Sequence, residues 1–128
     1  MVNPEAPWPA EVEADLASLV GDYNGFHPAI IRAMARAKTA GVFQLLRDGL
    51  VVGTMVLSRM VCRAGQVLHL HALVVHDATF RGWPEILRRA LIEVARRNGC
   101  VAVRAVTRRD LERLFNAERL ESTFILRV

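Results

Sequence analysis

Long apolar runs, metal-binding cysteine motifs and a secretion signal are all missing from this sequence. No stretch of about 18 consecutive apolar residues occurs, which argues against a conventional membrane-spanning helix. Cys62 and Cys100 match no metal-site spacing, so we expect two small hydrophobic residues, with a disulfide between them left open. The first segment, MVNPEAPWPAEVEADL, is acidic and proline-rich rather than basic and apolar, which indicates a cytoplasmic protein.

Lysine is nearly absent, since Lys38 is the only lysine among 17 basic residues. The formal net charge of +4 favours anionic partners, whether a nucleotide cofactor, nucleic acid or an acidic protein surface. The basic residues are interspersed with acids, and no recognisable nucleic-acid-binding motif or aromatic–basic platform occurs. The sequence therefore argues against nucleic acid as the partner.

A length of 128 residues with 52% hydrophobic content suits one domain, residues 1–128, with a core of its own. Periodicity predicts helices at 9–22, 27–39 and 84–98, and a short helix at 108–117. It predicts strands at 42–47, 50–60, 67–76, 100–106 and 122–128. The apolar stripes of the three longer helices comprise Val12, Leu16, Leu19 and Val20; Ile30, Ile31, Met34 and Ala35; and Ile86, Leu87, Ala90, Leu91, Val94 and Ala95.

Turn residues connect these elements. Asp48-Gly49 between two apolar runs predicts a two-residue hairpin with a type I′ turn, and Arg63-Ala64-Gly65 predicts a second turn. Gly41 and Asn98-Gly99 are placed to end two of the helices. A strand that follows a helix indicates a right-handed crossover, so 100–106 should pair in parallel with 67–76. The fold class is α/β (α+β), a mixed sheet with the order α-α-β-β-β-α-β-α-β.

Two stretches carry a resemblance to a known family. LLRDGLVVGTMVLSR has an acidic-Gly turn followed by Val-Gly, and LVVHDATFRGWPEILRRALIEVARRNGC leads from a strand through an aromatic-Arg-Gly segment into a long helix. Arg119-Leu120 lies in a part that is similar to the family's closing helix and turn. In these features the chain resembles the GNAT superfamily of acetyl-CoA-dependent N-acetyltransferases, over nearly all residues after the first helix. The family's first strand would be reduced to residues 1–7.

The resemblance implies a cofactor site. The sheet would part between 67–76 and 100–106, and the pantetheine arm of acetyl-CoA would lie there. It would bond the backbone at the end of the first of these strands, and its pyrophosphate would lie on the amides of the Arg-Gly loop. The residues implied are Val74, Val75, Arg81, Gly82 and Trp83, with Arg108 able to reach the phosphates from the neighbouring strand.

The loop departs from the family's Arg-Gly-x-Gly-x-Gly pattern. After Gly82, Pro84 removes an amide donor, Glu85 adds a negative charge, and Ile86 adds bulk where backbone should approach the phosphates. An exposed Trp83 would mark an interaction surface, and a buried one would fill the space of the cofactor.

Catalytic groups of the family are hard to place. No Glu occurs within 67–75, and Phe115 stands where many members have a tyrosine. His69 and His71 alternate with leucines and share one strand face, so they are the catalytic candidates, although a solvated or interface face explains them too. They lack a third ligand, so no metal is expected. His76-Asp77 reads either as a base with its orienting partner or as a simple strand end.

Two functions remain open from the sequence. The first is a non-catalytic or weakly active GNAT-like domain with protein partners or self-assembly, such as a bacteriophage virion or assembly component. The second is an N-acetyltransferase that uses acetyl-CoA as acyl donor for an amine. The loop departures favour the first.

Overall fold

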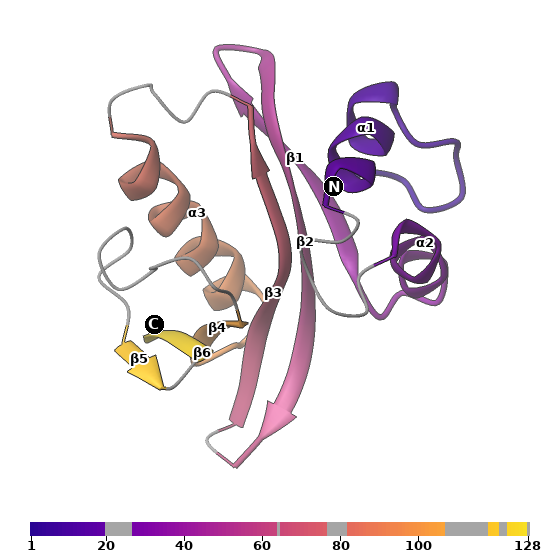
Figure 1. The fold of residues 1–128 in the computed structure, drawn as a ribbon. Helices are drawn as coiled ribbons and strands as arrows, with labels where there is room; N and C mark the ends of the chain where they lie inside the picture. The colour runs from indigo at the N-terminus through magenta and orange to yellow at the C-terminus, as the bar shows by residue number, and fades with distance from the viewer. Residues whose placement is uncertain (20–26, 64, 77–81, 107–117, 121–122, 128) are drawn as a thin grey trace. The chain divides into compact units, whose positions relative to one another are not determined.

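The computed structural model describes residues 1–19, 27–63, 65–76, 82–106, 118–120 and 123–127 (Figure 1). The elements in chain order are α1 (Ala10–Ser18), α2 (Pro28–Arg36), β1 (Gly41–Arg47), β2 (Leu50–Cys62), β3 (Gly65–Val75), α3 (Trp83–Arg97), β4 (Ala102–Val106), β5 (Glu118–Leu120) and β6 (Thr123–Arg127). The strands form one mixed sheet in the order β1-β2-β3-β4-β6-β5. The expected α+β fold with a meander and a βαβ crossover is confirmed.

The element order differs from the prediction near the C-terminus. Strand β5 was not expected, and Arg119 and Leu120 lie in it rather than in a turn. Three residues are too few to show the alternating pattern that identifies a strand from sequence. The short helix predicted at 108–117 lies outside the described residues. By contacts the chain divides into two units, one of Met1–Ser58 with His71–Asp77 and one of Arg59–Leu70 with Ala78–Val128.

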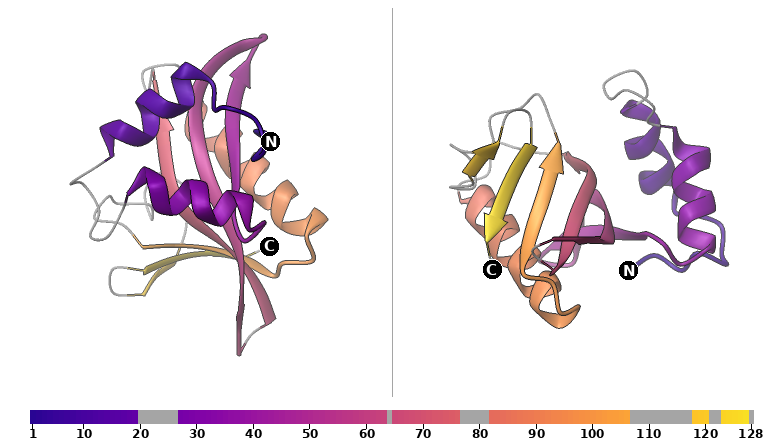
Figure 2. Two further views of the ribbon diagram at one scale, coloured as in Figure 1. Left: turned by 90° about the vertical axis from the view of Figure 1, so that its right-hand side faces the viewer. Right: turned by 90° about the horizontal axis from the view of Figure 1, so that it is seen from below.

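The first unit has a core between α1, α2 and the strands. Figure 2 shows α1 and α2 side by side. One hydrophobic cluster of this core comprises the buried residues Trp8, Val12, Leu16, Leu19, Ile31, Ala35, Val42, Val56 and Ala72. The α1 stripe is confirmed for Val12, Leu16 and Leu19, whereas Val20 lies outside the described residues. The inward placement of Ile30 was wrong, because its side chain is 52% exposed. The buried residues of α2 are Ile31 and Ala35, so its buried stripe is narrower than the sequence suggested.

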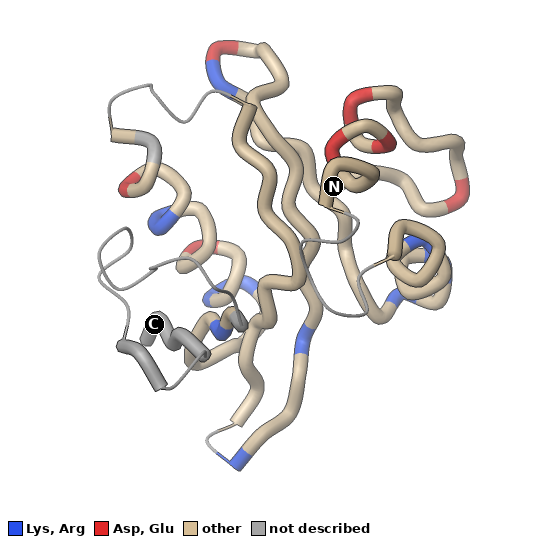
Figure 3. Tube along the Cα trace, in the orientation of Figure 1, with Lys and Arg blue, Asp and Glu red and all other residues tan. Residues whose placement is uncertain are grey.

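The start of α1 and the middle of α2 are joined by polar contacts above this core. The guanidinium of Arg32 lies 4.6 Å from the ring centroid of Trp8, a cation–π distance. Arg32 also pairs with Glu13 of α1. Figure 3 shows acidic residues gathered on α1 and the segment before it. The two helices are therefore linked by charge as well as by apolar packing.

Strands β1 and β2 form the expected hairpin. Asp48 and Gly49 have φ values of 52° and 80°, as a type I′ turn requires, and Arg47 pairs with Leu50. The end of α2 was predicted less well, because Lys38, with a φ of 61°, takes the left-handed position that follows the helix. Gly41 instead begins β1. The amide of Val2 donates to the carbonyl of Val42, so the N-terminal segment lies beside β1 without forming a strand.

The second unit contains the crossover. Strand β3 pairs in parallel with β4 from Val67↔Ala102 to Leu70↔Ala105, and β4 pairs antiparallel with β6. Helix α3 packs on β4, with Leu87, Leu91 and Ala95 buried. Ile86 was expected on this face but is 56% exposed, because it lies in the first turn, before the buried stripe begins.

Helix α3 ends as predicted at Asn98 and Gly99, where Gly99 has a φ of 68°. The amide of Cys100 then donates back to Ala95, so β4 begins two residues later than expected. Both cysteines are free thiols; Cys100 is buried like a small hydrophobic residue, but Cys62 is exposed. None of the helices in the described ranges is long and apolar enough to cross a bilayer.

Candidate functional site

The residues predicted to bind a cofactor fall into three groups. Val74 and Val75 form the half-buried end of β3. Gly82 immediately precedes α3 as its N-cap, and the backbone of Trp83 begins the helix. Arg81, Arg108 and the side chain of Trp83 lie outside the described residues.

The backbone at the N-terminus of α3 has a conformation that was not predicted from the sequence. Gly82 has a φ of 83° and a ψ of 6°, a left-handed conformation that side-chain-bearing residues rarely adopt. A Cβ placed on Gly82 would meet nothing within 4 Å apart from its chain neighbours, so there is space beside its Cα. A helix N-terminus with accessible amides suits an anion such as a phosphate.

Pro84 and Glu85 change what this terminus can offer. Pro84 lacks an N–H group, so it cannot donate to a phosphate. Glu85 lies in the first turn, where a negative charge stabilises the helix dipole, and its carboxylate lies 3.2 Å from Arg89 and 3.9 Å from Arg88. Part of the charge that would oppose a phosphate is therefore neutralised on the helix itself.

Strands β2 and β3 approach each other closely beside Val74. A Cβ at Gly53 would collide with the backbone carbonyl oxygen of Val74, and only glycine fits there. The amide of His76 donates to the carbonyl of Val52 at 2.8 Å. The Val-Gly pair in β2 thus has a packing reason: it lets the end of β3 lie against β2.

The two histidines predicted as catalytic candidates have different surroundings. His71 lies with its Nε2 atom 2.6 Å from the hydroxyl oxygen of Ser58. Burial lowers the pKa of His71 below its usual value of 6.5, so its imidazole is neutral at physiological pH. His69 is opposite Arg104 in the β3–β4 register. By strand alternation alone, His69 and His71 are still predicted to share one side of β3.

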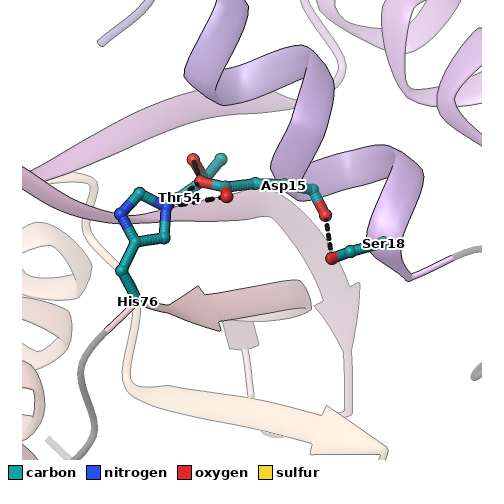
Figure 4. Close-up of polar contacts among 4 residues, drawn as sticks. All are labelled: Asp15, Ser18, Thr54 and His76. Atoms are coloured by element: carbon teal, nitrogen blue, oxygen red, sulfur yellow. Dashed lines mark hydrogen bonds and ion pairs between the residues drawn. The ribbon is translucent and has the colours of Figure 1, made fainter.

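A third histidine takes part in a network that sequence reasoning missed. The Nε2 atom of His76 lies 2.7 and 2.8 Å from the two carboxylate oxygens of Asp15, and the hydroxyl of Thr54 donates to Asp15 at 2.6 Å (Figure 4). These three residues come from α1, β2 and the end of β3. From the sequence, His76-Asp77 was either a base with its orienting partner or a simple strand end, and Asp77 lies outside the described residues.

One signal in the sequence could have revealed Asp15. It occupies the buried stripe of α1, between Val12 and Leu16, and its residue exposure is only 7%. A charged residue on an apolar helix face is rarely buried unless it is paired. The identity of its partners, however, depends on how α1 packs on the strands, which helical spacing does not specify.

No group of three or more metal-binding side chains occurs within the ranges that the structure describes. Neither cysteine lies in such a group. The described side chains include groups that can form hydrogen bonds and histidines that can transfer a proton, with charge from Asp15 and arginines.

Comparisons of sequence find no match, since neither a family model nor a curated protein matches the chain. Solved structures do. A Bacillus subtilis acetyltransferase in complex with CoA has a TM-score of 0.66 and 12% identity, over 96% of this chain and 95% of that one. A GNAT family acetyltransferase from Brucella melitensis in complex with acetyl-CoA has a TM-score of 0.63 and 18% identity, over 91% of this chain and 77% of that one.

A third similar structure is the AtaT–AtaR complex bound to DNA. It has a TM-score of 0.62 and 14% identity, over 98% of this chain and 91% of that one. At identities this low, the similarity concerns the fold. Together with the β3–α3–β4 crossover and the order of the strands, it shows that the chain has the fold of the GNAT acetyltransferases.

Proposed function

We propose that this protein is an acetyl-CoA-dependent N-acetyltransferase that acts on an amine. The observation that carries the proposal is the left-handed, open backbone of Gly82 at the N-terminus of α3, on a GNAT fold. The bound forms of two similar structures, one with CoA and one with acetyl-CoA, support the choice of ligand.

In this proposal the backbone does most of the binding. The main chain of Val74 and Val75 would bond the pantetheine arm, and the amides of Gly82 and Trp83 would bond the pyrophosphate. Arg81 and Arg108 are the proposed phosphate contacts from side chains. Acetyl-CoA supplies an activated thioester when bound. The amide of His76 donates to the carbonyl of Val52, so the end of β3 is held against β2 before the ligand arrives.

His69 and His71 remain proposed site residues. His71 is neutral at physiological pH and shares a hydrogen bond with Ser58, so it is suited to hold a neighbouring group in place or to accept a proton.

A non-catalytic GNAT-like module is the second candidate. Three residues at the start of α3 favour this candidate. Pro84 and Glu85 weaken phosphate binding there, and Ile86, which is 56% exposed, makes the surface more apolar. Such a module would bind protein partners or assemble with itself, as a virion or assembly component does. The similar AtaT structure is a complex with AtaR, which supports protein partners for this fold.

A transfer assay separates the two candidates. The protein is incubated with acetyl-CoA and a panel of small primary amines and peptides with free amino groups, and released thiol is measured. An enzyme releases thiol only when both acetyl-CoA and an amine are present. Absence of release across the panel, together with a stable oligomer or partner in gel filtration, would support the module instead.

A further inference from the structure

The buried carboxylate of Asp15 determines which nitrogen of His76 carries hydrogen. An ionised carboxylate can only accept hydrogen bonds, and both of its oxygens face Nε2 of His76. Nε2 must therefore donate, and in the neutral imidazole the lone pair is left on Nδ1. Figure 4 shows the second ring nitrogen pointing away from Asp15.

The network is built to hold that orientation. The side chain of Asp15 is 9% exposed, and Oδ2 also accepts from the hydroxyl of Thr54, a residue that is 1% exposed. The amide of His76 is bonded to Val52, so its backbone is held as well. The imidazole itself is 36% exposed. Solvent or a substrate can therefore reach the ring while its partner stays buried.

The place of His76 in the chain connects it to the proposed acyl-donor site. It is the next residue after Val75, at the end of the strand whose backbone we assign to the pantetheine arm. Within the described ranges, the charged group in hydrogen-bond contact with His76 is Asp15. The other acids of α1, Glu11 and Glu13, are exposed, and Glu13 pairs with Arg32.

We propose that His76 accepts a proton from the acceptor amine through Nδ1, and that Asp15 is the residue that positions it. This inference rests on the proposed acetyl transfer. The carboxylate holds the ring in the orientation that leaves Nδ1 available for the proton, as in other carboxylate–histidine pairs. His71 is less suited, because its Nε2 is bonded to Ser58 in a more buried place.

The proton and bond balance is simple. Nδ1 takes one of the three protons of the substrate ammonium group and later returns it to solvent. The nitrogen of the substrate amine then bonds to the thioester carbonyl carbon as the carbon–sulfur bond breaks. A second proton leaves with the sulfur as thiol, and the third stays on the product amide.

The test compares His76→Gln and Asp15→Asn with Glu13→Gln. Glutamine can keep a hydrogen bond to Asp15 but cannot accept the proton, and Glu13→Gln removes an exposed carboxylate from the same helix. For His76→Gln we expect kcat/KM to fall by roughly 10²- to 10⁴-fold, with loss of the rise in rate with pH and unchanged acetyl-CoA binding. Asp15→Asn should lower the rate but keep the pH dependence, and Glu13→Gln should match the wild type.

The outcomes separate this inference from the proposed function. If the wild type transfers acetyl groups and His76→Gln keeps its rate and pH profile, the assignment to His76 is wrong while the acetyltransferase stands. Failure of the wild type to bind acetyl-CoA would overturn both. Nitrogen NMR of the imidazoles gives a readout that needs no activity: the assignment requires hydrogen on Nε2 of neutral His76, and hydrogen on Nδ1 would overturn it.

Discussion

The carboxylate of Asp15 and Nε2 of His76 lie 2.7 Å apart, although 61 positions separate the two residues in the chain. This contact ties α1 to the end of β3 and brings together the one buried acid of α1 and the histidine that follows Val75. The same unit contains Thr54, whose hydroxyl completes the network. The contribution of the Asp15–His76–Thr54 network to stability can be tested separately from its part in the proposed reaction.

Replacing Asp15 by alanine should destabilise the protein. The change leaves the hydroxyl of Thr54 buried without its acceptor, and a buried unsatisfied polar group costs about 1–3 kcal/mol. Urea unfolding measures the loss. Glu11→Ala, at an exposed position on the same helix, is the control and should change the free energy of unfolding by less than about 0.5 kcal/mol. An equal effect of both variants would show that the network adds no stability.

Gly53→Ala should be strongly destabilising, because its Cβ would collide with the carbonyl oxygen of Val74, which is backbone and cannot rotate away. We expect a loss of at least about 3 kcal/mol, at the upper end of overpacking effects. In Gly41→Ala the nearest atoms, at 2.8 and 3.0 Å, belong to the side chains of Phe43 and Met1, which can move. Thermal unfolding should therefore separate the two variants, and similar melting temperatures would contradict the close approach of β2 and β3.

Stability should fall at mildly acidic pH in part because of His71. Its pKa is lowered in the folded state by burial, so below pH 6.5 the unfolded chain binds a proton that the folded chain does not. The contribution is complete above the unfolded value and is lost as the pH falls below it. The free energy of unfolding, measured from about pH 7.5 to about pH 5, should decline less steeply in His71→Gln than in the wild type. Parallel curves would rule out this contribution.

Glu85→Gln should strengthen the binding of acetyl-CoA. Removing a negative charge from the first turn of α3 favours an anion there by about 0.3–1 kcal/mol, which is roughly two- to fivefold in Kd. Glu93→Gln is the matched control, since Glu93 pairs with Arg97 near the other end of the same helix. If both changes have the same effect on Kd, the ligand does not bind at the N-terminus of α3.

Much of the fold could be predicted because local patterns specify it. Asp48-Gly49 can form only a few turns, and the alternation of strand, helix and strand from β3 to β4 has one common handedness. Exposure of Ile30 and Ile86 was missed, because periodicity gives the direction of a stripe but not where a partner element stops covering it. Strand β5 was missed because it is short.

The part of the candidate site that could be predicted from the sequence is the part that a local motif specifies. The sequence indicated Gly82 through its family-like Arg-Gly motif, but its left-handed conformation was not predicted. The pairing of Asp15 with His76 could not be foreseen, because it joins segments at opposite ends of the first unit's sequence. Such pairs depend on tertiary packing, which no short motif encodes.

Calorimetric titration of acetyl-CoA into the wild-type protein tests the central claim most directly. The account predicts saturable binding at micromolar affinity with a stoichiometry of about one per chain, tighter still for Glu85→Gln. No heat of binding at millimolar acetyl-CoA, with the protein folded, would contradict it and leave a GNAT fold without the GNAT reaction.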